Sequence, residues 1–177
     1  MTADQGGLPD GTNEPATVLL VDDEEDLRTL IRIGLQRSGS FRVVAEAANG
    51  RDAIDLAAEH APDVVLLDLM MPEVDGREAL PKIVSASPRS MVVVLSALQA
   101  RQEAAPSIAA GAFAYVEKTE LGSDMAGQLT SLLLEFRRAL RGETVLAPSS
   151  KVHVSAGVSG ATTAVAIADT DLGQQDD

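Results

Sequence analysis

Four short runs of apolar residues divide the chain, with room for a helix between one run and the next. They span residues 18–21, 64–67, 91–95 and 113–116. Their short length and their richness in Val and Leu favour buried strands over helices. In the intervening segments apolar residues recur every three or four positions, which is the spacing of one helix face. This alternation predicts βαβ units on a parallel sheet from Thr17 to about Arg141.

Residues that typically begin or end a helix set the limits of the predicted helices. The first helix follows an acidic cluster and ends at Gly39, before a weaker strand at 41–47. The second helix is expected to begin after a cap at Asn49 and to end before Pro62. The third should run from Asp75 to about Ser85, the fourth over 101–110 and the fifth over 123–141. Pro81 and Pro106 lie inside the third and fourth helices, where each removes an intrahelical hydrogen bond. We therefore expect a bend in the third helix and weak early turns in the fourth.

The two ends of the chain lack this periodicity. Residues 1–16 are rich in Gly, Pro, Asp and Thr, which predicts a flexible N-terminal leader. Residues 143–177 are rich in Ser, Thr, Ala, Gly and Asp, and we expect a flexible C-terminal tail. Weak strand-like pieces at 152–154 and 165–167 could form a marginal hairpin, but an isolated hairpin is not stable in water. The sequence thus predicts one folded domain over 17–142.

Charge and composition exclude several classes of function. The formal net charge is −13, from 14 Lys and Arg against 27 Asp and Glu. Nucleic-acid binding needs a basic face, so this balance argues against DNA or RNA as a partner. The chain has no Cys, which excludes disulfides and thiolate metal sites. It shows neither a signal peptide nor an apolar run near the ~20 residues of a membrane helix. We expect a cytoplasmic protein without membrane contact.

Polar groups able to bind a metal and a phosphoryl group stand at the ends of the predicted strands. Asp22 and Asp23 follow the first run, Asp68 follows the second, Ser96 follows the third, and Lys118 lies just beyond the last. Because the carboxyl ends of parallel strands meet at one edge of a sheet, these groups should share one crevice. Carboxylates suit a divalent cation, and a hydroxyl and an ammonium can hold phosphoryl oxygens.

Taken singly, each of these residues has an ordinary structural interpretation. The acidic run 22–26 could be a solvated helix start, and Asp68 or Ser96 could cap a turn. Lys118 alone is typical of a protein surface, and Tyr115 of a half-buried sheet position. Their joint placement at one edge of the sheet favours the functional interpretation.

The order of these residues resembles the receiver domain of two-component response regulators over 17–142. The resemblance rests on Asp22-Asp23, on the segment DLMMPEVDG at 68–76, on Ser96-Ala97, and on Tyr115 and Lys118. It implies a flavodoxin-like α/β fold, with a five-stranded parallel sheet in the order 2-1-3-4-5 and five helices on both faces. It also implies a phosphorelay function, with a histidine kinase or phosphotransfer protein as the phosphoryl donor.

The same resemblance implies the ligands of a phosphorylation site. Asp68 would be the phosphoacceptor, because a carboxylate can attack phosphorus when its charge is offset by a metal and a cation. Mg²⁺ would be the cofactor, bound directly by Asp23 and through water by Asp22. The carboxylate of Asp68 and the main-chain carbonyl of Met70 would complete the protein ligands.

Three further residues would bind the phosphoryl group or report its presence. Lys118 would pair with one phosphoryl oxygen, and Ser96 would donate a hydrogen bond to another. Tyr115 would turn inward as Ser96 moves. This switch implies an output through the surface of the fourth helix, fifth strand and fifth helix, which would bind a downstream protein or a second copy of the chain.

Two features set this chain apart within the resemblance. Thr119 follows Lys118 where many receivers have proline, so no X-Pro cis bond can shape that loop. Segments 111–118 and 141–148 are similar to the NarL-type subfamily, in which a helix-turn-helix domain follows the receiver. The tail 143–177 has one Lys and no Arg. We therefore expect the DNA-binding domain to be absent and the response regulator to stand alone.

The favoured interpretation is a regulator that is not an enzyme, apart from catalysing its own phosphorylation and dephosphorylation. Two alternatives remain. One is a pseudo-receiver, a binding module not regulated by phosphorylation, which would be expected to lack an acid or the lysine; Thr119 keeps this alternative open. The other is a haloacid-dehalogenase-like phosphatase, which also uses a strand-end Asp nucleophile. Such an enzyme needs a second acid two residues after the nucleophile, and that position is Met70.

Overall fold

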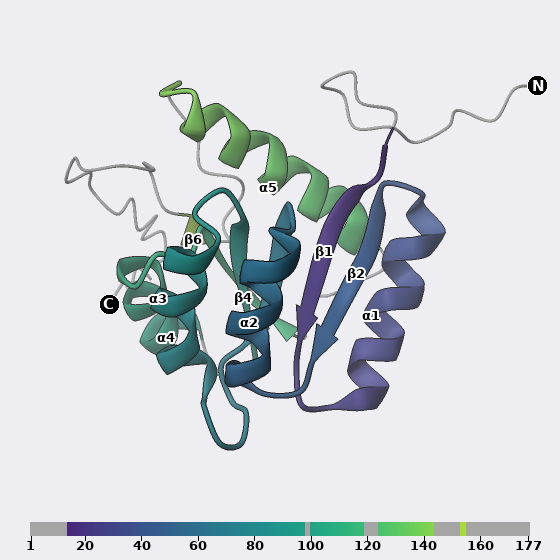
Figure 1. The fold of residues 1–177 in the computed structure, drawn as a ribbon. Coiled ribbons are helices and arrows are strands. Elements are labelled where there is room, and N and C mark those ends of the chain that lie inside the picture. The colour runs from purple at the N-terminus through teal and green to yellow at the C-terminus, as the bar shows by residue number, and fades with distance from the viewer. Residues whose placement is uncertain (1–13, 98–99, 119–123, 144–152, 155–177) are drawn as a thin grey trace, which may run out of the picture.

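Five parallel strands form the centre of the molecule in a computed structural model that describes residues 14–97, 100–118, 124–143 and 153–154. The strands are β1 (Ala16–Val21), β2 (Phe41–Ala47), β3 (Val64–Asp68), β4 (Met91–Ser96) and β5 (Ala114–Glu117). They lie in the order β2-β1-β3-β4-β5 (Figure 1). The predicted five-stranded parallel sheet and its order are confirmed.

A short sixth strand extends the sheet beyond β5. Strand β6 (His153–Val154) runs antiparallel to β5, with Val154 opposite Ala114 and His153 opposite Tyr115. The sequence indicates a weak strand-like piece at 152–154 but not its pairing with β5, because the partner strand is distant in the sequence. Residues 144–152 and 155–177 of the predicted tail, and residues 1–13 of the predicted leader, lie outside the described residues.

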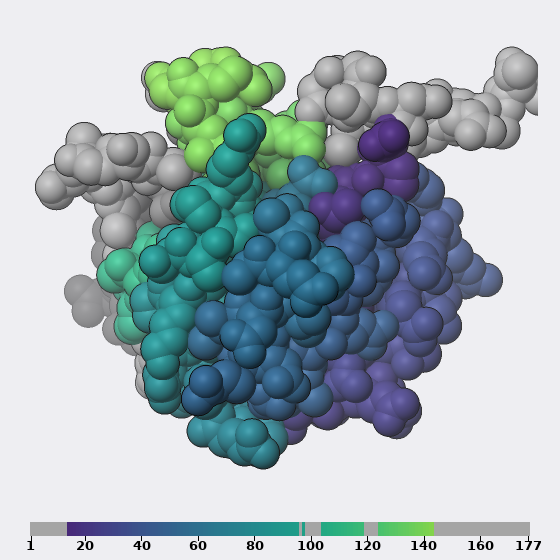
Figure 2. Space-filling model, in the orientation of Figure 1, coloured from purple at the N-terminus to yellow at the C-terminus, as the bar shows by residue number. Residues whose placement is uncertain are grey.

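Five helices connect the strands and cover both faces of the sheet. They are α1 (Glu25–Ser38), α2 (Gly50–His60), α3 (Gly76–Ala86), α4 (Ala100–Ala109) and α5 (Met125–Leu140). Alternate strand residues divide the core: Val18 and Leu20 face α1 and α5, whereas Leu19 and Val21 face α2, α3 and α4. The side chains of α2 and α3 close over the second face (Figure 2). This two-sided burial explains why the strands read as continuous apolar runs.

The predicted helix limits agree with the structure to within about two residues, because local chemistry sets them. Gly39 adopts a φ of 70° after α1, and its N–H donates to the carbonyl of Gln36. The side chains of Asn49 and Asp75 accept hydrogen bonds from Asp52 N–H and Glu78 N–H, and so cap α2 and α3. Both helices with internal prolines, α3 and α4, continue beyond them.

Candidate functional site

The acidic residues of the site come from two neighbouring strands. Val21 of β1 pairs with Leu67 of β3, so that Asp22 and Asp68 are the next residues along each strand. Both carboxylates are buried, with each residue 2% exposed. Burial of two acids at one sheet edge is costly unless a cation or hydrogen-bond donors compensate.

Lys118, directly after β5, supplies that compensating charge. Its Nζ lies 2.7 Å from Asp22 Oδ2 and 2.9 Å from Asp68 Oδ2. A third acid, Glu24, is more distant at 3.9 Å and its side chain is 68% exposed. The structure thus brings together the strand-end acids and the lysine, although the proline that many receivers carry after this lysine is replaced by Thr119. Residue 119 itself lies outside the described residues.

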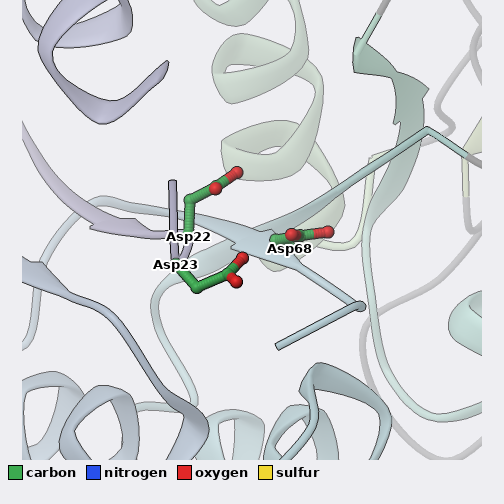
Figure 3. Close-up of side chains that lie close together, drawn as sticks. All are labelled: Asp22, Asp23 and Asp68. Carbon is green, nitrogen blue, oxygen red and sulfur yellow. The ribbon is translucent and has the colours of Figure 1, made fainter. Parts of the chain in front are cut away.

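Asp23 completes a cluster of three carboxylates that fits a divalent cation. Asp22, Asp23 and Asp68 each offer an oxygen, and these oxygens all lie within 4.8 Å of one another. Figure 3 shows the Asp23 carboxylate directed toward Asp68. Asp23 is exposed, so a cation held here would keep access to water. Mg²⁺ prefers oxygen ligands and retains several waters, and this donor set suits it.

The pKa of Asp68 and that of Lys118 are both raised, for different reasons. Burial raises the pKa of Asp68 above 3.8, and the hydrogen bonds from Lys118 and from the N–H of Met70 only partly oppose it. Burial lowers the pKa of Lys118, but its hydrogen bonds to Asp22 and Asp68 outweigh this effect and hold the pKa above 10.5. Lys118 therefore stays charged and is the group that allows Asp68 to ionise in a buried position.

The segment after Asp68 fixes the orientation of its carboxylate. Met70 N–H donates to Asp68 Oδ1 at 3.1 Å, while Oδ2 faces Lys118. The chain then turns back, and Gly76 N–H donates to the carbonyl of Leu69 at 3.0 Å. A Cβ on Gly76 would lie 2.0 Å from the Asp68 carbonyl oxygen, so only glycine fits here. The Asp-Gly pair at 75–76 thus begins α3 and also allows the loop after Asp68 to turn back against Leu69.

Arg28 also supports the site, a role that no pattern in the sequence indicates. Its guanidinium donates to the carbonyl of Asp22, and it pairs with Glu46 on β2 at 3.3 Å. Asp22 Oδ1 in turn accepts the N–H of Glu24 at 2.9 Å. An arginine one turn into an amphipathic helix looks like any surface cation in the sequence, and only the tertiary structure brings it to the strand end.

The structure describes the strand positions of both predicted switch residues, Ser96 and Tyr115, but the side chain of Tyr115 alone. Ser96 is the last residue of β4 and lies opposite Glu117, one residue beyond the partner of Asp68. Its side chain lies outside what the structure describes. Tyr115 pairs with Val94 in the sheet and is fully buried, with 0% exposure. It packs in the cluster beneath α2, α3 and α4.

Comparison with known proteins assigns the chain to a family. The model of the response regulator receiver domain matches residues 18–129, from β1 into α5. The chain belongs to this family. The predictions of a receiver domain, based on the strand-end residues, and of a role in two-component signalling are therefore confirmed.

Several proteins of known role are similar to this receiver. The nitrate/nitrite response regulator NarL of Escherichia coli K12 is 37% identical over 133 residues, which are 75% of this chain and 58% of NarL. The response regulator VraR of Staphylococcus epidermidis is 36% identical over 77% of this chain and 62% of VraR. The receiver thus spans about three fifths of the length of these curated relatives.

Solved structures carry the same fold. The signal receiver domain of the putative response regulator NarL from Mycobacterium tuberculosis has a TM-score of 0.64 and 28% identity, covering 68% of this chain and 98% of that domain. A CheX–CheY complex from Borrelia burgdorferi, with BeF3 and Mg²⁺, has a TM-score of 0.65 and 28% identity, covering 71% and 95%. No helix in the described part of this receiver is long and apolar enough to cross a membrane.

Proposed function

We propose that this receiver accepts a phosphoryl group on Asp68 from the phosphohistidine of a histidine kinase or phosphotransfer protein. The observation that carries the proposal is a buried carboxylate 2.9 Å from the Lys118 ammonium and within 4.8 Å of two further carboxylates. Family membership supports it, because the matched region contains the whole acidic cluster.

The transfer is an in-line displacement at phosphorus. An Asp68 oxygen attacks as the bond from phosphorus to the donor imidazole nitrogen breaks, and the electron pair of that bond stays on the nitrogen. The product is an acyl phosphate on Asp68. Lys118 is placed to transfer its contact from the Asp68 carboxylate to a phosphoryl oxygen, which offsets the added negative charge.

We assign Mg²⁺ to the acidic cluster, with Asp23 as a direct ligand and Asp22 acting through water. Asp22 already faces Lys118 and the N–H of Glu24, whereas Asp23 is exposed and directed toward Asp68. Asp68 and the carbonyl of Met70 complete the proposed ligand set. When bound, Mg²⁺ neutralises charge on the phosphoryl oxygens. The Mg²⁺ in the related CheX–CheY complex supports this choice.

The pseudo-receiver alternative receives no support from the geometry, because the three acids and Lys118 are all present and close together. A haloacid-dehalogenase-like phosphatase would need an acid at position 70, where the chain has the exposed thioether of Met70. We propose that catalysis is restricted to phosphorylation and dephosphorylation of the chain itself.

Intact-mass measurement tests the phosphoacceptor directly. Incubation with Mg²⁺ and acetyl phosphate should add one phosphoryl group to the wild-type chain and none to Asp68→Asn. Asp55→Asn, which changes an exposed carboxylate on α2, is the matched control and should label like the wild type. Labelling that persists in Asp68→Asn, or that needs no divalent cation, would refute the assignment.

The proposed output is a change in binding to a downstream protein, or in self-association, through α4, β5 and α5. The phosphoryl group adds about −1.5 to −2 charges beside three Asp residues, and the resulting movement of Ser96 would release Tyr115 to change its rotamer. Tyr115 lies under α4, which makes it a physical link between the site and this surface.

A test of this output compares phosphorylated wild type with two variants at Tyr115. Tyr115→Ala should keep labelling by acetyl phosphate and lose the phosphorylation-dependent change in sedimentation or partner binding. Tyr115→Phe fills the same space and separates loss of the ring from loss of the hydroxyl. An unchanged response in Tyr115→Ala, or salt-dependent binding of duplex DNA by the phosphorylated chain, would contradict the proposal.

A further inference from the structure

Gly50, the first residue of α2, contacts the loop that follows Asp68, although it lies 18 positions before Asp68 in the sequence. Its N–H donates to the carbonyl oxygen of Val74 at 2.9 Å. A Cβ at this position would lie 2.5 Å from that same oxygen, 2.8 Å from Ala79 Cβ and 2.9 Å from Val74 Cγ1. Ordinary contacts between such atoms exceed 3.4 Å, so no side chain fits here without displacing its neighbours.

The reason for glycine is close approach rather than an unusual backbone conformation. Gly50 is absent from the described residues with positive φ, whereas Glu73, next to Val74, has a φ of 66°. A non-glycine residue in the left-handed region is strained and needs its surroundings to hold it. The hydrogen bond from Gly50 lies directly after this strained residue, where it can hold the loop.

The loop held by Gly50 is the one that orients the Asp68 carboxylate. It is closed at its base by the hydrogen bond from Gly76 to Leu69, and at its start by the bond from Met70 N–H to Asp68 Oδ1. Because the loop spans only residues 69–75, a shift at Val74 is passed through a few bonds to Met70. The Asp68 carboxylate would then lose its aligned donor on the Oδ1 side.

We infer that Gly50 is a positioning residue for the phosphorylation site, acting through Val74 and the 69–75 loop on Asp68. This inference rests on the proposed function, in which Asp68 ligates Mg²⁺ and accepts the phosphoryl group. Helix α2 cannot simply retreat to make room, because Ala53 and Ala57 are fully buried in the core. A side chain at position 50 would therefore displace the 69–75 loop.

Calorimetric titration with Mg²⁺ and rates of labelling by acetyl phosphate test the inference. Gly50→Ala should weaken Mg²⁺ binding about tenfold, the usual loss for residues that orient a metal ligand, and should slow labelling. Gly34→Ala makes the same substitution within α1, where the new methyl meets only Met125 Cε at 3.4 Å, and should change neither quantity.

A second control separates positioning from general destabilisation of α2. Asn49→Ala removes the cap of the same helix start without adding an atom against Val74, and it should lower the melting temperature while leaving Mg²⁺ affinity unchanged. Equal Mg²⁺ affinities for Gly50→Ala and wild type would overturn the inference. So would an equal loss of affinity in Asn49→Ala.

Amide hydrogen exchange on the wild-type chain gives a readout that does not depend on a variant folding. Saturating Mg²⁺ should slow exchange of the Gly50 amide, since the cation stabilises the loop that accepts its hydrogen bond. The Gly39 amide, bonded to Gln36 at the end of α1, should not respond. No effect at Gly50 would overturn the inference. If Mg²⁺ binds as expected but Asp68 is never labelled, the proposed function fails while the positioning role remains.

Discussion

The consecutive acids Asp22, Asp23 and Glu24 have unlike surroundings, and this difference determines what each can do. Asp22 is buried against Lys118, and Asp23 is exposed but within the carboxylate cluster. Glu24 comes no closer than 3.9 Å to the Lys118 Nζ, and its side chain is 68% exposed. The sequence presents all three as one acidic run. Position relative to the end of β1 separates a charge partner, a proposed metal ligand and a solvated side chain.

Substitutions in this run should therefore have unequal effects on Mg²⁺ binding. Asp23→Ala should weaken Mg²⁺ at least about tenfold, the loss found even for groups outside the direct ligands. Glu24→Ala removes one negative charge from the neighbouring position. It should change the dissociation constant for Mg²⁺ by less than about twofold, because exposed charges are screened. Titration calorimetry at fixed ionic strength measures both. Equal losses would indicate a diffuse electrostatic attraction instead of a coordinated ion.

At the level of elements, Asp63 joins α5 to the two central strands at the end of the sheet away from the site. It precedes β3 and accepts hydrogen bonds from the N–H and hydroxyl of Thr17 on β1, both at 2.8 Å. Arg137 of α5 pairs with it at 3.1 Å. Burial raises the pKa of Asp63, but the Thr17 bonds and Arg137 outweigh it, and the pKa lies below 3.8.

Arg137→Ala should lower the free energy of unfolding by about 0.5–1 kcal/mol at pH 7, since the pair is partly exposed. An acid whose pKa is lowered by folding adds stability above its ordinary value of 3.8, and this stability is lost as the pH falls through the folded-state pKa. The difference between wild type and Arg137→Ala should therefore be constant above about pH 4 and shrink below it.

Urea unfolding from pH 7 down to pH 3 measures this difference. Arg138→Ala is the matched control, because Arg138 forms its ion pair with Glu135 of the same helix, and its side chain is 54% exposed. It should change stability by less than Arg137→Ala. A gap between wild type and Arg137→Ala that widens toward pH 3 would contradict the role given to Asp63.

For the whole molecule, the sheet builds the site, and we expect the site not to need the segment after Gly142. Asp22 and Asp23 follow β1, Asp68 ends β3, and Lys118 follows β5. The apolar side chains of these strands belong to the two cores between sheet and helices. Strand β6 adds only two residues at the far edge, next to β5. Since three or more strands with a packed face suffice for stability, the five parallel strands should hold without it.

A chain ending at Gly142 should accordingly fold and label with acetyl phosphate at the rate of the full chain. Its melting temperature should fall by no more than a few degrees, the change expected for about 1 kcal/mol in a domain of this size. Circular dichroism and intact mass give the two readouts. A large loss of either would show that residues beyond 142 contribute to the core or to the site through more than β6.

The sequence by itself determined the five parallel strands, the helices between them, and the strand-end acids and lysine that the structure brings together. Helix limits such as Gly39 and Asn49 depend on local backbone chemistry, which a linear sequence contains in full. The strand-end acids could be found because a parallel sheet aligns the ends of its strands, whatever the exact loop geometry.

The tertiary structure alone decided the contacts between elements that are distant in sequence. No periodicity could reveal that Arg28 donates to the carbonyl of Asp22, that β6 pairs with β5, or that Gly50 meets Val74. These contacts depend on distances of a few ångströms between packed elements. Burial likewise raises the pKa of Asp68, and no pattern along the chain encodes that shift. Strand-end position predicts which residues meet, but packing sets how closely they approach and therefore what chemistry they support.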